Sequence, residues 1–323
     1  MTCSDIDMKP LDIIVTGELN VDIILNNISG FPEMGKEILA GNLDMTLGSS
    51  SAIFAGNLSS LGSKVAFIGK IGHDGFSATV LESLQKLGVN TSHIIRSAEF
   101  NTGATIVLNY GNDRAMVTYP GAMEDLKAAD IDLGFIGNAR HLHFSSVFLQ
   151  PGIRSSLPWL FAQAKSMGLT TSLDPQWDPE EKWEINAAEL FPHLDVFMPN
   201  KAEFLNITAS ETIEKGIEKI KLIAPKLILV IKDGTNGAYA WNGSRLLHQP
   251  SFLNENPVDC IGAGDSFNAG FIRKFTSGAS LEECLEYGSI TGAVSTTCAG
   301  GTGAFTDMKK AGEVAQKLFN KTL

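Results

Sequence analysis

Short apolar runs alternate with amphipathic stretches along most of the chain. The apolar runs have the length and composition of buried strands and lie at residues 12–19, 64–71, 141–147, 170–173, 196–198 and 226–231. Helical spacing of apolar residues appears between them, at residues 51–61, 75–87, 211–223 and 266–276. This alternation predicts an α/β protein with a mainly parallel central sheet that helices cover on both faces.

Two segments interrupt the alternation, at residues 20–47 and 102–123. Both have strand character without an intervening helix, and Gly111-Asn112-Asp113 is typical of a turn. They are interpreted either as a pair of edge hairpins or as a small β-sheet lid, formed by two excursions of one domain close to a site at the sheet's carboxyl edge. We find no linker, repeat or low-complexity tract, so we expect one domain over residues 1–323 with this lid.

Composition narrows the classes of function. The 323 residues are 44% hydrophobic and carry a formal net charge of −11, which allows a large core but provides no basic surface for general nucleic-acid binding. Any anionic ligand must therefore be held by local backbone geometry. The four cysteines lack paired zinc or disulfide spacing, and no apolar run approaches the roughly 18 residues of a membrane span. The N-terminus does not resemble a signal peptide, so we expect a soluble cytoplasmic protein with no membrane partner.

The strongest local feature is Gly262-Ala263-Gly264-Asp265, which immediately precedes a helix striped with phenylalanines. Backbone N–H groups of three small residues can converge at a helix N-terminus, where the helix dipole favours an anion. Asp265 would then lie beside a bound phosphate and could remove a proton from an attacking hydroxyl. The alternative is that the glycines only form a tight turn and that Asp265 is an ordinary residue of a first helical turn.

Other chemistries lack their sequence patterns. The chain contains no P-loop, no G-x-G-x-x-G, no H-E-x-x-H and no G-x-S-x-G. His141 and His143 follow one predicted strand, and we expect them to face core and solvent rather than a metal.

Five elements, in order, resemble the ribokinase-like (PfkB) family of carbohydrate kinases over roughly residues 12–305. They are Gly17-Glu18-Leu19-Asn20-Val21-Asp22, residues 48–75 with their glycines, Pro199-Asn200-Lys201-Ala202-Glu203, Lys232-Asp233-Gly234-Thr235-Asn236-Gly237, and Asp259 through Gly270 around the Gly-Ala-Gly-Asp motif. The resemblance implies a three-layer α/β/α fold and ATP-dependent transfer of the γ-phosphoryl group to a hydroxyl of a small sugar.

The resemblance also implies roles for single residues. Asp265 is the expected catalytic base, with Gly262, Ala263 and Gly264 as the anion hole. The expected substrate-binding residues are Asp22, Gly48 and Ser49. The expected nucleotide-binding residues are Asn200, Glu203, Lys232, Gly234, Gly237 and Ser289. Mg²⁺ would accompany ATP near Asn200 and Glu203, and a monovalent cation, K⁺, would lie near Asp259. Lids of this kind often pair in relatives, which implies a homodimer.

Each of these roles has a structural alternative. Asp22 could be a surface residue, and Asn200 with Glu203 could simply cap the helix that follows. Lys232 could be solvated at the end of its strand, and Gly234 and Gly237 could serve only the geometry of a turn.

Departures from the family pattern leave the identity of the phosphorylated substrate undetermined. Ser49 stands in place of a second glycine, Ile53 in place of an asparagine, and Cys260-Ile261 in place of a frequent pair of threonines. Asp174-Pro175-Gln176-Trp177-Asp178 is similar to the D-P-N-x-R of some sugar-acid kinases but lacks its arginine, which removes a counter-charge for a carboxylate such as that of 2-keto-3-deoxygluconate.

Three hypotheses remain as alternatives to a kinase that acts on a small neutral sugar. One is a 2-keto-3-deoxygluconate kinase on the same fold. Another is a nucleoside kinase, for which Phe100, Tyr110 and Tyr119 near the lid could stack on a base. The third is a non-catalytic sugar or nucleotide sensor, which the altered first motif favours and the retained Asp265 disfavours.

Overall fold

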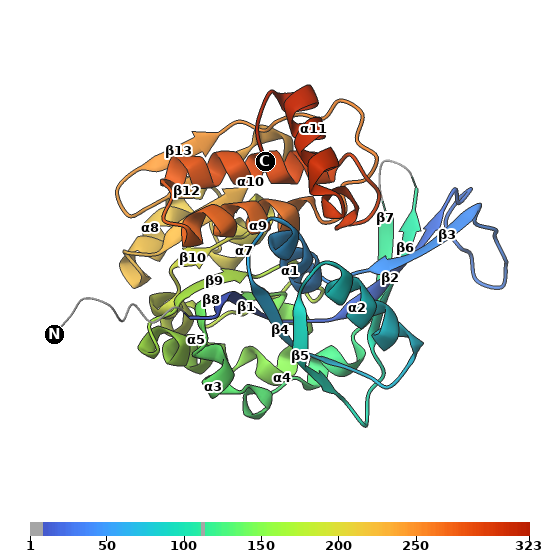
Figure 1. Cartoon of the computed structure of the whole chain (residues 1–323), viewed down its shortest axis with the longest axis horizontal. Helices are drawn as coiled ribbons and strands as arrows, with labels where there is room; N and C mark the ends of the chain where they lie inside the picture. The colour runs from blue at the N-terminus through green and yellow to red at the C-terminus, as the bar shows by residue number, and fades with distance from the viewer. Residues whose placement is uncertain (1–8, 111–113) are drawn as a thin grey trace.

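The computed structural model describes residues 9–110 and 114–323, so Cys3 and the predicted turn at residues 111–113 lie outside the described residues (Figure 1). A nine-stranded sheet forms the centre, in the order β13-β12-β11-β10-β9-β8-β1-β4-β5. Its strands are β1 (Leu11–Thr16), β4 (Val65–Ile71), β5 (Asn90–Arg96), β8 (Ala139–Ser145), β9 (Thr170–Asp174), β10 (Val196–Phe197), β11 (Ile228–Lys232), β12 (Ala238–Trp241) and β13 (Leu246–Gln249). The pairs from β11 to β5 are parallel, and β12 and β13 add an antiparallel edge.

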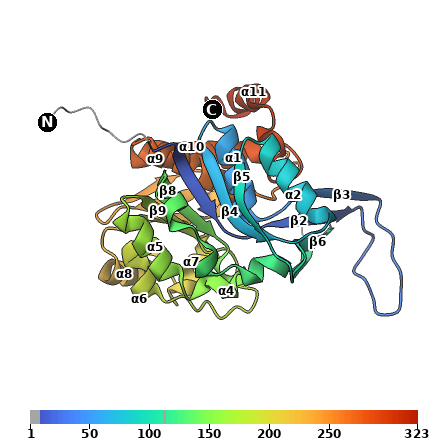
Figure 2. The ribbon, with the colours of Figure 1, turned by 60° about the horizontal axis from the view of Figure 1, so that its bottom comes forward.

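Helices cover both faces of this sheet, as the alternation predicts (Figure 2). One face carries α1 (Ser50–Ser60), α2 (Gly75–Lys86), α9 (Ala263–Thr276), α10 (Leu281–Ser295) and α11 (Met308–Phe319). The other carries α3 (Leu133–Ile136), α4 (Pro151–Arg154), α5 (Leu157–Ser166), α6 (Ala187–Leu190), α7 (Lys201–Ile207) and α8 (Ile213–Ile223).

The sheet separates two hydrophobic cores. Side chains along a strand point alternately to its two faces, so Ile13 and Val15 of β1 enter one core while Ile14 enters the other. Because both faces are buried, the central strands are continuous apolar runs, and this is why they are recognisable in the sequence.

The two interrupting segments meet in a second, four-stranded sheet, to the right in Figure 1. Its strands are β3 (Asn42–Leu47), β2 (Asn20–Asn26), β6 (Gly103–Asn109) and β7 (Arg114–Tyr119), in this spatial order. The outer pairs are antiparallel, whereas β2 and β6 run parallel. Each segment therefore forms a hairpin, as the first alternative predicts, and the parallel pair β2–β6 joins the two hairpins into one sheet that is separate from the main sheet.

Several elements lack a clear sequence signal. The strand β5 lies at the edge of the main sheet and mixes polar with half-buried residues, while β12 and β13 contain four residues each. The helix α10 buries small and polar residues on several sides, so it has no apolar stripe. Within the described part of the chain, no helix is long and apolar enough to cross a membrane.

His141 and His143 are both completely buried, so the expectation that one faces solvent is wrong. Residues two apart on a strand share a face, and the hydroxyl of Ser172 on β9 lies 2.7 Å from Nε2 of His141 and 2.6 Å from Nδ1 of His143. Their other ring nitrogens contact the hydroxyls of Thr170 and Ser145. All four ring nitrogens thus have a hydroxyl partner, as buried polar groups of the core usually do.

Burial lowers the pKa of His141 to about 3 and also lowers that of His143. Because the unfolded chain binds a proton on each ring below about pH 6.5, the free energy of unfolding should fall as the pH drops from about 6.5 toward 3. We expect each histidine to contribute a slope of up to about 1.4 kcal/mol per pH unit.

Urea unfolding of the wild type and of the His141→Gln/His143→Gln double variant, between pH 7 and 4.5, measures this contribution. Glutamine does not titrate in this range, so the difference between the two curves should shrink or reverse in sign as the pH falls. A difference that is constant with pH would contradict the assignment.

Candidate active site

Polar side chains gather where the parallel strands of the main sheet end. Asp174 closes β9 and is completely buried, and Lys232 closes β11 two strands away. The Lys232 Nζ donates to Asp174 Oδ2 at 2.8 Å and to the Asn268 side chain at 3.2 Å. Asn268 also donates to Asp174, so this carboxylate is paired and hydrogen-bonded as a buried charge must be.

The helix α9 begins at this edge, with Gly262 as its N-terminal cap. The backbone of Gly262 is in the left-handed region, with φ 72°, and a Cβ there would lie 2.6 Å from the Cα of Gly301. Only glycine meets both conditions without strain. The predicted motif therefore forms the start of the helix, where unpaired backbone N–H groups favour an anion.

Asp265 lies in the first turn of α9 and is buried beside Asp174. Burial is the main cause that raises its pKa to about 8; the negative charges of Asp174 and Glu18 add to this, while Lys232 and a hydrogen bond from the Ser50 side chain act in the opposite direction. A carboxyl group with such a pKa is a better proton acceptor than an exposed one and is matched to work near neutral pH.

Glu18, just beyond β1, is a second buried carboxyl group at this edge. It accepts hydrogen bonds from the Ser51 backbone and hydroxyl and from the Ser146 hydroxyl. Burial raises its pKa. Its charge raises the pKa of both Asp22 and Asp265, so it lies within electrostatic reach of both predicted functional carboxyls.

Asp22 belongs to β2 of the small sheet and is buried. Its pKa is raised to about 6, mainly by burial. Only glycine fits beside it at position 48, because a Cβ on Gly48 would lie 2.2 Å from Asp22 Oδ1 and 2.6 Å from Asn20 Oδ1. The Oδ1 atom of Asn20 is buried and has no hydrogen-bond partner in the described structure.

Ser49 and Ile53 show what the departures from the family pattern do. Ser49 keeps a glycine-like backbone, with φ 70°, while its hydroxyl donates to the Glu18 carbonyl and caps α1. Ile53 packs against Gly262 and Gly301, the pair that shapes the start of α9. Both side chains support the backbone of the site, and neither is free for polar contact with a ligand.

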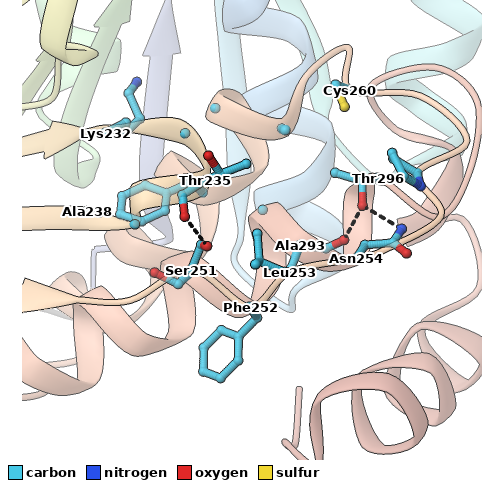
Figure 3. A pocket seen from close by; sticks show the side chains of 18 residues that line it. Lys232, Thr235, Ala238, Ser251, Phe252, Leu253, Asn254, Cys260, Ala293 and Thr296 are labelled. Carbon is cyan, nitrogen blue, oxygen red and sulfur yellow. Dashed lines mark hydrogen bonds between the residues drawn. The ribbon is translucent and has the colours of Figure 1, made fainter. Parts of the chain in front are cut away.

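A pocket of about 330 Å³ lies on the other side of the α9 N-terminus (Figure 3). Six predicted residues line it: Lys232, Gly234, Gly237, Ala263, Gly264 and Ser289. The segment from Ser251 to Pro257 and the helix α10 complete its walls, and most of these walls are apolar. An apolar pocket that opens onto helix N–H groups fits a flat aromatic ring carrying phosphates.

Asn200 and Glu203 do not line this pocket. They form a capping box on α7, in which each side chain binds the backbone N–H of the other and Asn200 Nδ2 donates to Glu203 Oε1 at 2.6 Å. Both residues therefore cap α7. Glu203 is nevertheless buried, and burial followed by the charge of Asp174 raises its pKa, so it belongs to the same electrostatic cluster.

Asp259 fastens the loop before the anion hole. Its two carboxylate oxygens accept from the backbone N–H groups of Ile261 and Gly300, at 2.8 and 2.9 Å. The predicted residue thus joins the two loops that meet at Gly262.

Several side chains at the site lack an assignment from the sequence, among them Glu18, Asn20, Ser50, Asp174, Gln176 and Asn268. Gln176 Nε2 donates to Asp174 Oδ2 at 3.0 Å and to Asp265 Oδ1 at 3.1 Å. A signal did exist for two of them. Asn268 follows Asp265 by three residues on a helix and so shares its face, and Asp174 ends a predicted strand at the carboxyl edge.

Comparison with known proteins identifies the family of the chain. Residues 11–308 match the pfkB family carbohydrate kinases, and the chain belongs to this family. It is 26% identical to fructokinase-2 of Oryza sativa subsp. japonica over 97% of this chain and 96% of the relative. It is 26% identical to 2-dehydro-3-deoxygluconokinase of Bacillus subtilis over 88% of this chain and 89% of the relative.

The structure of ribokinase from Thermotoga maritima superposes with a TM-score of 0.80 at 26% identity, over 95% of this chain and 99% of that one. The chain therefore has the ribokinase-like fold and is an ATP-dependent sugar kinase.

The close approach of Asp22 and Asn20 to Gly48 allows a direct test of whether the sugar acceptor binds there. In Gly48→Ala the new methyl group must displace the side chains of Asp22 and Asn20. We expect the KM for the acceptor to rise at least about tenfold, since a hydrogen bond to a charged group contributes about 1.5–3 kcal/mol. The KM for ATP should stay unchanged. Steady-state kinetics in each substrate checks this, and an unchanged acceptor KM would place the acceptor elsewhere.

Proposed function

We propose that the enzyme transfers the γ-phosphoryl group of ATP to a primary hydroxyl of a small neutral sugar, with Asp265 as the base. The observation that carries this proposal is the position of Asp265, which is buried in the first turn of α9 and directly follows Ala263 and Gly264, two residues that line the pocket. One helix start thus supplies both N–H groups for the transferred phosphoryl group and a carboxylate for the attacking hydroxyl.

The chemistry follows from these contacts. The deprotonated Asp265 accepts the proton of the sugar hydroxyl as its oxygen approaches phosphorus. The backbone N–H groups around Gly262, Ala263 and Gly264 stabilise charge that develops on the transferred group. Lys232 lies against Gly264, since its Nζ is 3.9 Å from where a Cβ of that residue would lie, and so contributes positive charge at the same place.

A magnesium ion fits this site as a companion of the nucleotide. The described residues hold no cluster of three acidic or histidine ligands, and both oxygens of Glu203 already accept hydrogen bonds. Such a site suits Mg²⁺, which commonly keeps several waters and takes its other ligands from phosphates. When bound, it neutralises phosphate charge; Glu203 and Asn200 would act on it through water. A K⁺ ion beside Asp259 is a further part of the proposal.

The small sheet has one face suited to a sugar. Asp22, Thr46, Thr105 and Thr118 stand in register across its strands and share a face. We propose that residues 20–47 and 102–123 form a lid on a single kinase domain of residues 1–323, and that this polar face closes over the acceptor. Excluding water would protect ATP from hydrolysis. A cytoplasmic location, where ATP is available, belongs to the same proposal.

A sugar acid is the second candidate. Asp178, which replaces the arginine of the D-P-N-x-R pattern, is buried and accepts from three backbone N–H groups, of Glu180, Lys182 and Trp183. It cannot recognise a carboxylate. The charge of Arg114, however, lowers the pKa of Asp22, so a cation acts on the acceptor side. The nucleoside hypothesis is disfavoured, because Tyr119 lies on the opposite face of its strand from Thr118 and Tyr110 already stacks on Phe31 at 4.6 Å.

The activity is tested by ADP release from Mg·ATP with ribose, fructose, 2-keto-3-deoxygluconate, inositols and nucleosides. We expect stimulation by one neutral sugar. Asp265→Asn should remain folded, because the amide keeps the shape, yet lose at least about 100-fold in turnover, the usual contribution of a general base. Wild-type turnover in that variant would contradict the assignment of the base, and stimulation by the sugar acid alone would favour the second candidate.

The outer face of the lid suggests a partner. Leu43, Met45, Val117 and Tyr119 all lie on the face opposite Asp22 and are each about half exposed or more. Proteins rarely leave such apolar sheet faces uncovered, so we propose a homodimer through the lids.

Light scattering at micromolar concentration should give twice the chain mass for the wild type. It should give a lower mass for Met45→Glu/Val117→Lys, because each substitution places a charge in the apolar face. A monomeric wild type would contradict the dimer.

A further inference from the structure

The side chain of Gln176 joins two carboxyl groups that would otherwise face each other across the site. Its Nε2 lies 3.0 Å from Asp174 Oδ2 and 3.1 Å from Asp265 Oδ1. Asp174 fixes which end of the amide faces the site, because a carboxylate paired with Lys232 can only accept hydrogen bonds and only the NH₂ end of glutamine can donate. When Asp265 is ionised, as a base must be, the same NH₂ group donates to both carboxylates.

The backbone of Gln176 is also unusual. Its φ is 59°, in the left-handed region that glycine and asparagine tolerate and glutamine seldom adopts. The segment after it is held in shape by the three backbone hydrogen bonds to Asp178 and by the perpendicular rings of Trp177 and Trp183, 4.8 Å apart. A residue with a strained backbone whose side chain reaches a reacting group is expected where position matters more than stability.

Asp174 does not need this amide for its own charge. Lys232 and Asn268 already donate to it, as the pair described above shows. For Asp265 the balance is different. It meets the negative charges of Asp174 on β9 and Glu18 beyond β1, with Lys232 on β11 as the opposing cation and the Ser50 hydroxyl as the other donor. The Asp265 carboxylate is repelled by the negative charge of Asp174. The Gln176 side chain donates a hydrogen bond to Asp265 from this same direction.

We propose that Gln176 is a positioning residue, whose amide holds the Asp265 carboxylate in the orientation that receives the acceptor proton and favours its ionised form. This inference rests on the proposed role of Asp265 as the base. It predicts a loss of turnover rather than of binding when the amide is removed, because Gln176 contacts neither the nucleotide pocket nor Asp22 among the contacts of the described residues.

Two variants separate the amide from the backbone. Gln176→Leu keeps a side chain of similar size without the donor, and Gln176→Gly also relieves the left-handed backbone. Glu181→Gly is the matched control, since Glu181 lies in the same loop, also has a positive φ, 54°, and is exposed. The control should keep wild-type kinetics.

We expect both Gln176 variants to melt within a few degrees of the wild type, with Gln176→Gly at least as stable as Gln176→Leu. Their kcat at pH 7 should fall about tenfold or more while both KM values stay within about twofold. The acid limb of the kcat–pH profile should move up by about one unit, the shift that corresponds to a tenfold loss of the ionised base. The loss should therefore be smaller at pH 9.

Wild-type kcat and an unmoved acid limb in Gln176→Leu would overturn the inference, as would equal losses in the Glu181→Gly control. If the wild type itself shows no acceptor-dependent turnover, the proposed function fails instead. The hydrogen bond is then still tested by ¹³C NMR of the Asp265 carboxyl group, whose pKa should be higher in Gln176→Leu than in the wild type; equal values would reject it.

Discussion

The site depends on one partly buried cation that serves several buried carboxyl groups. Asp174 and Lys232 end two parallel strands and pair at 2.8 Å; the Asp174 side chain is inaccessible to solvent, and that of Lys232 is 13% exposed. Breaking a buried pair by removing one partner leaves an uncompensated charge, which usually costs about 3–5 kcal/mol. The pair therefore fixes both strand ends, and Asn268 and Gln176 are oriented by Asp174 in turn.

This arrangement explains why a helix start can carry a base. An aspartate in the first turn of an exposed helix would be ionised and ordinarily stabilised by the helix dipole. Asp265 instead meets burial and the charges of Asp174 and Glu18, which together raise its pKa to about 8. As the pH rises toward that value, the free energy of unfolding falls, because the aspartate of the unfolded chain loses its proton at a much lower pH than the buried Asp265 does. The protein thus loses some stability but keeps a strong proton acceptor at the start of α9, where we propose that the phosphoryl group binds.

Much of the fold could be predicted from the sequence because its signals are local. Buried parallel strands are continuous apolar runs, and α9 shows its phenylalanine stripe and its glycine start. Elements without such a pattern, such as β5 and α10, depend on neighbours that are distant in the chain. The motif residues Gly262, Gly264 and Asp265 form the start of α9, and Ser289 of α10 lines the same pocket as Gly264.

The contacts of the site are where the sequence was insufficient. Gln176 was visible only as a departure from a pattern, and nothing in its neighbours indicated that a left-handed backbone would turn its amide toward a residue 89 positions away. Likewise, Asn200 and Glu203 of the third family element are expected from the sequence to bind the nucleotide, whereas in the structure they form a helix cap. Such roles depend on the geometry of the folded chain, which spacing alone does not give.

The titration of Asp265 tests this account most directly. In the nucleotide-free enzyme labelled with ¹³C at aspartate carboxyl groups, the Asp265 signal is identified by its absence from Asp265→Asn. We predict that it titrates near pH 8, as the raised pKa requires. A titration near pH 4, the value of an exposed aspartate, would contradict the claim that burial beside Asp174 prepares this carboxyl group as a base.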